Sequence, residues 1–343
     1  MRVLIVTAVP AERDAVVRGV GATAPEVAEL PVPGGVIHRL SPAPPTGPPL
    51  TVDVLAAGVG PAAAAAGTAA ALTAAAVART PYDLAVSAGI GGGFSTPRPG
   101  AAHLAPGTPH PDTAHPDTGT APSSSAALPD TDPAHSHSHS HSPGTVPPDT
   151  GTGHSRSPGT APLGPPDTGT APLGPPDTDT VPPRPGTVPL GSIVVADAIV
   201  AADLGAETPD GFTAVTDLGF GTVEHLPPAP LVAAVAEATN AVRGTVLTVS
   251  TVTGSAERAA ELLRRHPQAA AEAMEGFGVA EAAAAQSVPV LEVRAVSNTV
   301  GPRDRAAWRI GEALEALTGT FGTLAPLLPL LGTWTSDPEG TRQ

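Results

Sequence analysis

Apolar segments typical of strands alternate with helical segments along most of the 343-residue chain. The apolar runs are rich in Val and Ile and end at glycines or polar residues, as buried strands do. Strands are predicted at 2–8, 36–40, 50–58, 82–89, 191–200, 244–252 and 291–298, and helices at 10–20, 61–79, from about 255, at 276–286 and at 303–317. This alternation predicts an α/β fold in which a parallel or mixed sheet is covered by helices on both faces.

Residues 95–188 interrupt this pattern with a different composition. They are filled with Pro, Gly, Thr, Asp and Ser, and include the near-repeat GTAPLGPPDTGTAPLGPPDTDT. Without apolar periodicity this segment cannot bury enough surface to offset the entropy of ordering it. We expect a disordered, low-complexity insertion in a loop, where added length costs little free energy. Residues 1–94 and 189–331 are then predicted to form one domain, followed by a tail at 332–343.

The insertion also carries the tract HSHSHSHS, residues 135–142, and eight of the eleven histidines of the chain. Alternating histidines can bind a transition metal. A structured metal site, however, needs supporting groups around its ligands, which a disordered segment does not supply. We therefore expect a solvated repeat and no metal site.

Composition and charge exclude several classes of function. The chain has 17 basic residues, all of them Arg, against 32 acidic residues, and its net charge of −15 argues against a nucleic-acid partner. The absence of Cys excludes disulfides, zinc thiolates and cysteine nucleophiles. No signal peptide is expected, because Pro10, Glu12 and Arg13 directly follow the apolar N-terminus. The apolar stretch 61–78 is mostly Ala and is predicted to be a packed helix rather than a membrane span, so a cytoplasmic location is expected.

Two glycine-rich turns are candidates for ligand binding. AAGVGPAA, residues 56–63, satisfies the loose dinucleotide pattern G-x-G-x-x-A. A dinucleotide fold would need an acidic residue at the end of the next strand, where this chain has Ser87 to Gly89, so nicotinamide or flavin chemistry is not expected. SAGIGGGF, residues 87–94, ends a strand where open α/β sheets bind ligands, and Gly89 to Gly91 are predicted to belong to that site. Gly92 and Gly93 fit either the site or a hinge into the insertion.

Polar residues in apolar surroundings are further candidates. Glu12 lies in the first turn of a predicted helix, where an acidic residue often interacts only with the helix dipole. Glu275 either caps the helix that begins at Gly276 or binds a ligand, because a buried carboxylate without a partner is costly. The strand LEVRAVSN, residues 291–298, ends in Ser297 and Asn298, which either terminate the strand or contact a ligand.

Along the chain, short motifs follow one another in the order AGVGP, SAGIGGG, LGSIVVAD, TGSAE, AMEG and RAVSN. In this order they resemble the nucleoside phosphorylase/hydrolase superfamily, which includes the 5′-methylthioadenosine/S-adenosylhomocysteine nucleosidases and the purine nucleoside phosphorylases. The stretches TAVPAERDAV, TDLGFGTVEH and SNTVGPRDRAAWRIGEAL are most similar to the futalosine hydrolases of menaquinone biosynthesis. The resemblance implies a three-layer αβα sandwich with a central mixed sheet, hydrolysis of a nucleoside, no cofactor and a homo-oligomer.

The resemblance also implies roles for particular residues. Glu12 matches the general base that activates water, while Met274 and Glu275 match the pair that holds the ribose. Gly89, Ile90 and Gly91 match the backbone under the base and sugar, and Thr251 and Val252 fall near the position that contacts the purine.

Asn298 stands where the adenine-specific nucleosidases of the family have Asp. The amide of Asn offers two N–H donors, which suit the O6 and N7 acceptors of hypoxanthine, whereas a carboxylate would oppose O6. Asn298 therefore predicts a 6-oxopurine such as the base of futalosine. The alternatives are a phosphorylase, in which Arg39, Arg79 or Arg294 would hold phosphate, an adenine-type nucleosidase, and a nucleoside sensor without catalysis.

Overall fold

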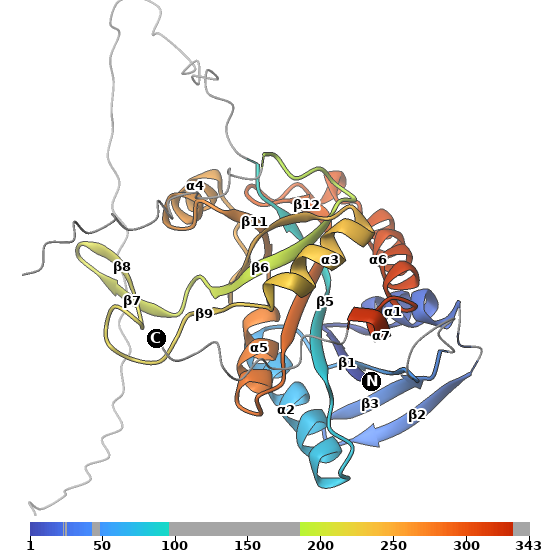
Figure 1. Ribbon diagram of the computed structural model, residues 1–343. Coiled ribbons are helices and arrows are strands. Elements are labelled where there is room, and N and C mark those ends of the chain that lie inside the picture. The colour runs from blue at the N-terminus through green and yellow to red at the C-terminus, as the bar shows by residue number, and fades with distance from the viewer. Residues whose placement is uncertain (23, 25, 43–48, 96–185, 332–343) are drawn as a thin grey trace, which may run out of the picture. The chain divides into compact units, whose positions relative to one another are not determined.

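The computed structural model describes residues 1–331 apart from 23, 25, 43–48 and 96–185 (Figure 1). The insertion predicted to be disordered lies outside the described residues, apart from its outermost residues 95 and 186–188. The His-Ser tract and the predicted C-terminal tail also lie outside them.

A mixed 10-stranded sheet forms the centre of the described chain, with the strand order β11-β10-β6-β12-β5-β1-β4-β3-β2 and with β9 paired to β6. Its strands are β1 (Arg2–Thr7), β2 (Val27–Val32), β3 (Gly35–Leu40), β4 (Thr51–Ala56), β5 (Leu84–Gly93), β6 (Ile193–Ala201), β9 (Glu224–His225), β10 (Val242–Thr248), β11 (Ala269–Ala273) and β12 (Val290–Thr299). β1 is parallel to β4 and β5, and β12 is parallel to β5 but antiparallel to β6. A separate hairpin is made by β7 (Gly205–Thr208) and β8 (Gly211–Ala214).

Pairing of β11 with the end of β5 joins two distant parts of the sheet. Because β11 also pairs with β10, the strands β11, β10, β6, β12 and β5 close into a ring. Closure brings the ends of β5, β11 and β12 together, which decides where the candidate site lies.

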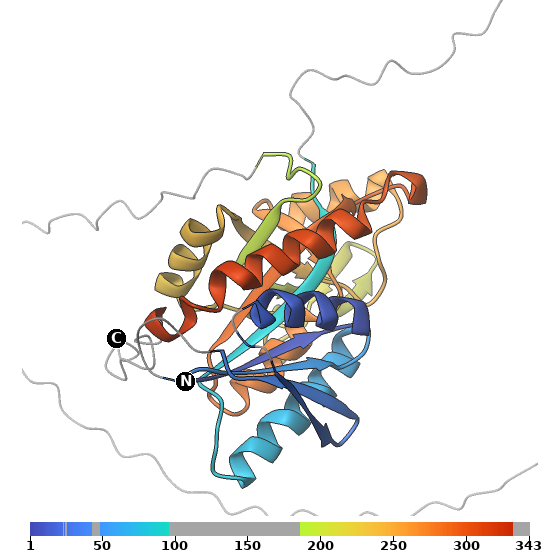
Figure 2. The same ribbon diagram turned by 90° about the vertical axis from the view of Figure 1, so that its right-hand side faces the viewer.

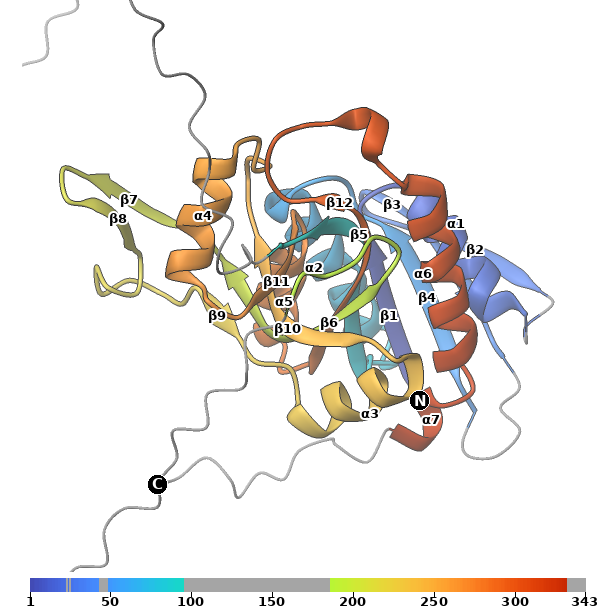
Figure 3. The same cartoon turned by 90° about the horizontal axis from the view of Figure 1, so that it is seen from above.

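Helices cover both faces of the sheet, as the views in Figures 2 and 3 show. On one face lie α1 (Pro10–Gly21), α3 (Ala229–Thr239) and α6 (Ile310–Leu324), whose apolar residues share one core with the strands. On the other face lie α2 (Pro61–Val77) and α5 (Gly276–Ala284), which contribute to a second core. α4 (Ala256–Arg265) packs Leu262 against β10, and the short η1 (Arg305–Ala307) and α7 (Leu328–Leu331) flank α6. The predicted three-layer αβα sandwich is thus confirmed.

The Ala-rich helix α2 is a packed helix, as expected. It lies so close to α5 that a Cβ atom on Gly278 would be 2.1 Å from the carbonyl oxygen of Pro61. Only small side chains permit such an approach of two helices. Within the described residues, no helix has the length and apolar character needed to cross a membrane.

Two strands extend further than predicted. β5 continues to Gly93, so the hinge interpretation of Gly92 and Gly93 is wrong: both glycines pair with β11 and β12 as strand residues. β12 continues to Thr299, so Ser297 and Asn298 do not terminate their strand, although the register shifts between Val296 and Asn298. The strand continues past Ser297 because Gly92 and Gly93 of β5 pair with Asn298 and Thr299.

Other boundaries also differ from the prediction. β4 stops at Ala56 and β10 at Thr248, and the last long helix starts only at Ile310. The strands β2 and β11, the hairpin of β7 and β8, and the helix α3 were not predicted at all.

Candidate active site

A pocket of about 260 Å³ opens where the ends of β1, β5 and β12 meet the turn between β11 and α5. Open α/β sheets bind their ligands at such carboxyl ends of strands. The residues that line the pocket are Ala8, Val9, Glu12, Val59, Ile90, Gly91, Gly92, Val252, Thr253, Glu272, Ala273, Met274, Glu275, Ser297, Asn298, Val300 and Trp308.

Most of the predicted site residues meet in this pocket. Those that line it are Glu12, Ile90, Gly91, Val252, Met274, Glu275 and Asn298. Gly89 does not line it but lies directly beside Glu12. Thr251 lines a neighbouring cavity with Asp203 and Arg258 instead. The position predicted for Thr251 therefore falls one residue outside the pocket.

Glu12 is buried and tightly held, with 3% of its surface exposed. Its Oε2 accepts hydrogen bonds from the backbone N–H of Ala8 at 3.0 Å and of Val9 at 3.2 Å. Its Oε1 accepts from the N–H of Ile90 at 2.9 Å. Pro10 starts α1 so that Glu12 falls in its first turn, and the carboxylate folds back onto the residue before the helix. One side chain thus stabilises the helix end and faces the pocket.

The protonation of Glu12 is set by opposing effects. Burial raises the pKa of the Glu12 carboxyl above its ordinary value, and the negative charge of Glu275 raises it further. The positive charge of Arg294 and the hydrogen bond from the N–H of Ile90 lower this pKa, but they do not cancel the effect of burial. A carboxylate with a raised pKa is a stronger base toward a water molecule than an exposed one.

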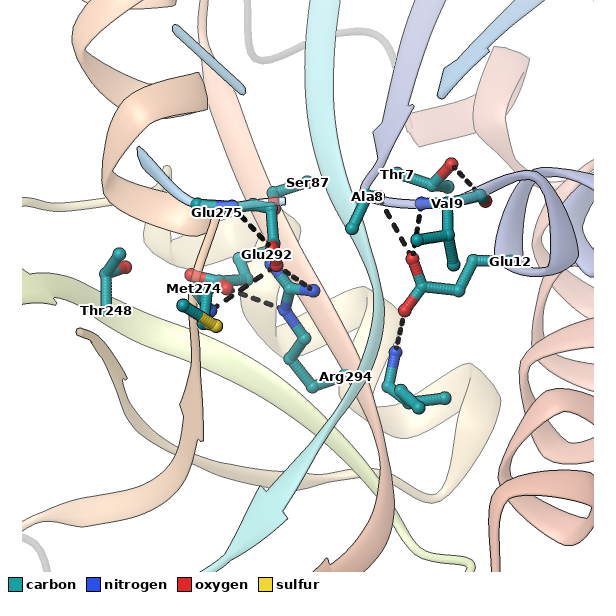
Figure 4. A network of polar contacts seen from close by, with 12 residues as sticks. Thr7, Ala8, Val9, Glu12, Ser87, Thr248, Met274, Glu275, Glu292 and Arg294 are labelled. Atoms are coloured by element: carbon teal, nitrogen blue, oxygen red, sulfur yellow. Dashed lines mark hydrogen bonds and ion pairs between the residues drawn. The ribbon is translucent and has the colours of Figure 1, made fainter. Parts of the chain in front are cut away.

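Arg294 organises the floor of the site from a completely buried position (Figure 4). Its Nε donates to Glu292 Oε1 at 2.8 Å and its Nη2 donates to Ser87 Oγ at 2.8 Å. Its Nη1 lies 3.2 Å from Glu275 Oε2. Burial disfavours the cation, but the carboxylates of Glu292, Glu275 and Glu12 outweigh burial and raise the pKa of Arg294. Arg294 is therefore a fixed positive charge next to two carboxylates that line the pocket.

Gly89 lets the two charged groups of the site approach one another. A Cβ atom on Gly89 would lie 2.6 Å from Glu12 Oε1 and 2.7 Å from Arg294 Nη1. Such distances are too short for any real side chain. The absence of a side chain at Gly89 is therefore a requirement of the Glu12 and Arg294 arrangement.

Glu275 is turned into the pocket rather than over the helix that follows it. It occupies the residue before α5 but makes no capping hydrogen bond with its side chain, so the capping interpretation is wrong. Its Oε1 instead accepts from the backbone N–H of Gly60 at 3.2 Å. Gly60, with a φ of 93°, belongs to the AGVGP turn, which thus supplies a backbone donor to Glu275.

Asn298 is held by its own strand. Its Oδ1 accepts from Ser297 Oγ at 2.9 Å, and its Nδ2 donates to the carbonyl oxygen of Thr299 at 3.0 Å. An amide nitrogen carries two N–H donors and this second contact uses one of them. The arrangement orients a donor of Asn298 at the pocket wall.

Several pocket residues were not found from the sequence. Glu272 comes from the unpredicted strand β11, and its carboxylate accepts from the N–H of Thr253 at 2.9 Å and from the hydroxyl of the same residue. Burial raises the pKa of Glu272, against its hydrogen bonds to Thr253. Trp308 follows η1, and the guanidinium of Arg303 lies 5.4 Å from the centre of its ring. The roles of Glu292 and Ser87 as partners of Arg294 were also missed.

Comparison with known proteins agrees with this arrangement. Residues 184–322 match the family described as the Phosphorylase superfamily. The chain is 51% identical to a futalosine hydrolase of Streptomyces coelicolor over 96% of this chain and 97% of that protein. It is 44% identical to a futalosine hydrolase of Acidothermus cellulolyticus over 45% of this chain and 63% of that protein.

Solved structures show the same fold at low sequence identity. A 5′-methylthioadenosine/S-adenosylhomocysteine nucleosidase from Neisseria meningitidis, in complex with methylthio-immucillin-A, matches with a TM-score of 0.55 and 14% identity, over 96% of this chain and 99% of that one. A futalosine hydrolase mutant of Helicobacter pylori matches with a TM-score of 0.55 and 14% identity, over 95% of this chain and 98% of that one. With the near full-length match to the Streptomyces protein, the chain belongs to the futalosine hydrolase family of the phosphorylase superfamily.

Proposed function

We propose that this chain hydrolyses the N-glycosidic bond of futalosine, releasing hypoxanthine and dehypoxanthine futalosine in the futalosine route of menaquinone biosynthesis. The observation that carries the proposal is the grouping of Glu12, Glu275 and Asn298 in one pocket, in a chain 51% identical to a futalosine hydrolase. The proposed site consists of Glu12 and Asn298 as catalytic residues, with Gly89, Ile90, Gly91, Val252, Met274 and Glu275 around the substrate.

The reaction begins with lengthening of the bond between C1′ of the sugar and N9 of the base. Positive charge develops on the sugar and the bonding electron pair moves onto the purine, as in other glycosyl transfers. The amide of Asn298 donates to the purine, and this hydrogen bond strengthens as negative charge accumulates there. Glu275 accepts from the ribose hydroxyls, since Arg294 and the N–H of Gly60 keep its carboxylate in place.

Water then attacks C1′ from the side of Glu12. Its oxygen forms the new bond to C1′ and its proton passes to the Glu12 carboxylate, while the released base takes up a proton from solvent. The raised pKa of Glu12, which burial causes, makes its carboxylate a better acceptor for this proton.

The disposition of the arginines favours water over phosphate as the nucleophile. Arg39 donates from Nε and Nη2 to Asp53, at 2.7 Å in both contacts, and lies away from the pocket. Arg294 is engaged by Glu292, Ser87 and Glu275. Arg79 follows the C-terminal end of α2, the end opposite the AGVGP turn. A phosphorylase needs a cation to hold its anion, and none of these three arginines lines the pocket.

Product analysis with purified protein tests the proposal. Futalosine is incubated in phosphate-free buffer and in phosphate buffer, and the products are identified by mass spectrometry. We expect hypoxanthine and the free sugar at equal rates in both buffers. Release of base only with phosphate, together with a sugar phosphate, would establish a phosphorylase, and tight binding without release would establish a sensor.

We further propose that the protein works as a homo-oligomer. Leu218, Phe220 and Leu226 lie close together in the chain and are 42%, 68% and 69% exposed. Exposed apolar residues are typical of a surface that a partner covers where they form one contiguous patch. Light scattering coupled to size-exclusion chromatography tests this, and a monomer would contradict it. The cytoplasmic location stays a prediction, for which cell fractionation is the test.

A further inference from the structure

Glu272 is a buried carboxylate in the pocket that the proposed hydrolysis does not use. It lies in β11, has 4% of its surface exposed, and lines the pocket together with Asn298. Glu12 and Glu275 already supply the base and the sugar contact. Burying a carboxylate costs free energy unless hydrogen bonds or a cation compensate it. A third buried carboxylate in the same pocket therefore indicates a role of its own.

The strand register places Glu272 opposite Asn298. Gly92 of β5 pairs with Glu272 on one side and with Asn298 on the other. Residues that pair across neighbouring strands direct their side chains to the same face of a sheet. A Cβ atom on Gly92 would lie 3.2 Å from Asn298 Nδ2, which confirms that Asn298 faces this side.

The middle position of this row has no side chain. With neighbouring strands roughly 5 Å apart, the Cα atoms of Glu272 and Asn298 are separated by roughly 10 Å. Gly92 adds no side chain to this row and lines the pocket, and the Cγ2 of Val300, another lining residue, lies 2.8 Å from the position that a Cβ atom on Gly92 would take. A flat ring that enters the pocket beside this row can meet both the Asn298 amide and the Glu272 carboxylate.

Thr253 fixes the Glu272 carboxylate in this orientation. Its backbone N–H donates to Oε1 at 2.9 Å and its hydroxyl donates to Oε2 at 2.5 Å. A carboxylate has about four acceptor positions on its two oxygens, so these contacts leave acceptor capacity for a ligand. Glu272 is thus oriented before any ligand binds.

A 6-oxopurine has the complementary pattern of hydrogen-bonding groups. Its N1–H is a donor, and the neighbouring O6 and N7 are acceptors, so a carboxylate matches N1–H and an amide donor matches O6 or N7. Adenine reverses two of these groups: its N1 is an acceptor, which opposes a carboxylate, and its 6-amino group is a donor, which opposes an amide N–H.

We propose that Glu272 is a specificity-determining residue, whose carboxylate accepts the N1–H of a 6-oxopurine base while Asn298 donates to O6 or N7. This inference rests on the proposed function of the same pocket. It adds a second discriminating group to the one found from the sequence, and it gives β11 and Thr253 a role in base recognition.

The test compares Glu272→Gln with the unmodified chain on futalosine and on its 6-amino analogue. Gln keeps the size of the side chain and can still contact Thr253, but it presents an N–H donor that suits the N1 of an adenine-type base. We expect the ratio of kcat/KM for the two substrates to shift toward the 6-amino analogue by roughly 10²-fold. Glu237→Gln, which removes an exposed charge on α3, is the matched control and should leave the ratio unchanged.

Two outcomes would overturn the inference. An unchanged ratio would do so, and so would an equal fall in kcat/KM for both substrates, because the latter is what a purely structural anchor of Thr253 predicts. Glu272→Met, of similar volume and without an acceptor, should also lose the preference and serves if the Gln variant does not fold.

Calorimetry can measure the binding of hypoxanthine and of adenine to the unmodified chain and to Glu272→Gln. Because this measurement needs no turnover, it separates the inference about Glu272 from the proposed function. If the unmodified chain does not cleave futalosine, the proposed function fails, yet selective binding of hypoxanthine that is lost in Glu272→Gln would still support the role of Glu272. Equal binding of both bases by the unmodified chain would contradict it.

Discussion

At the scale of single residues, the protonation of Glu12 links the structure to a measurable pH dependence. The carboxylate must be ionised to accept a proton from water, and burial raises its pKa. Activity is therefore expected to fall as the pH decreases through this raised pKa, at a higher pH than the ordinary glutamate value of about 4.3 would give. The pH profile of kcat/KM for futalosine measures this. An acid limb that persists in the residual activity of Glu12→Gln would assign it to another group.

The candidate site was only partly predictable at this scale. Glu12, Met274, Glu275 and Asn298 stand in sequence motifs, so a resemblance to a family could identify them. Arg294 stands in an apolar strand pattern, and its partners are separated from it by as many as 207 residues. Such partners are decided by strand register, which local sequence does not encode.

At the scale of elements, β5 carries the tightest contact of the site at Gly89. Gly89→Ala would place a methyl group within 2.7 Å of both Glu12 Oε1 and Arg294 Nη1. We expect a loss of about 1–3 kcal/mol of stability from overpacking, together with a severe loss of activity. Chemical denaturation and the futalosine assay measure the two effects.

Gly319→Ala in α6 is the matched control for this substitution. A Cβ atom on Gly319 would have no neighbour within 4 Å. The change should stabilise the protein by roughly 0.5–1 kcal/mol, because Ala favours the interior of a helix over Gly, and leave activity unchanged. Normal activity of Gly89→Ala would contradict the placement of the two charged groups over Gly89.

The predicted and the missed elements differ in composition. Strands such as β1 and β6 are rich in Val and Ile, whose branched side chains favour strands, and both were predicted. β11 has the sequence AAAEA, which by itself favours a helix. It is a strand because β10 and β5 pair with it on its two sides, so tertiary structure overrides local preference.

At the scale of the whole molecule, the two chain segments that flank residues 96–185 lie side by side. The backbone N–H of Val188 donates to the carbonyl oxygen of Phe94 at 3.1 Å. A short Gly/Ser linker can therefore replace residues 96–185, at a small change in loop-closure free energy. We expect the shortened chain to retain its melting temperature and its activity on futalosine. Insoluble or inactive protein would contradict the prediction of a single domain formed by residues 1–94 and 189–331.

The central claim is that Glu12 drives hydrolysis of futalosine in this pocket. The most direct measurement is hypoxanthine release by Glu12→Gln, with futalosine binding and thermal unfolding recorded on the same sample. Since both oxygens of Glu12 accept backbone N–H groups, Gln opposes one of these donors, and Glu12→Ala serves as a second variant. Glu26→Gln, an exposed change, is the control. We predict that release falls by roughly 10²- to 10⁴-fold in a folded variant that still binds futalosine; release at the unmodified rate would contradict the account.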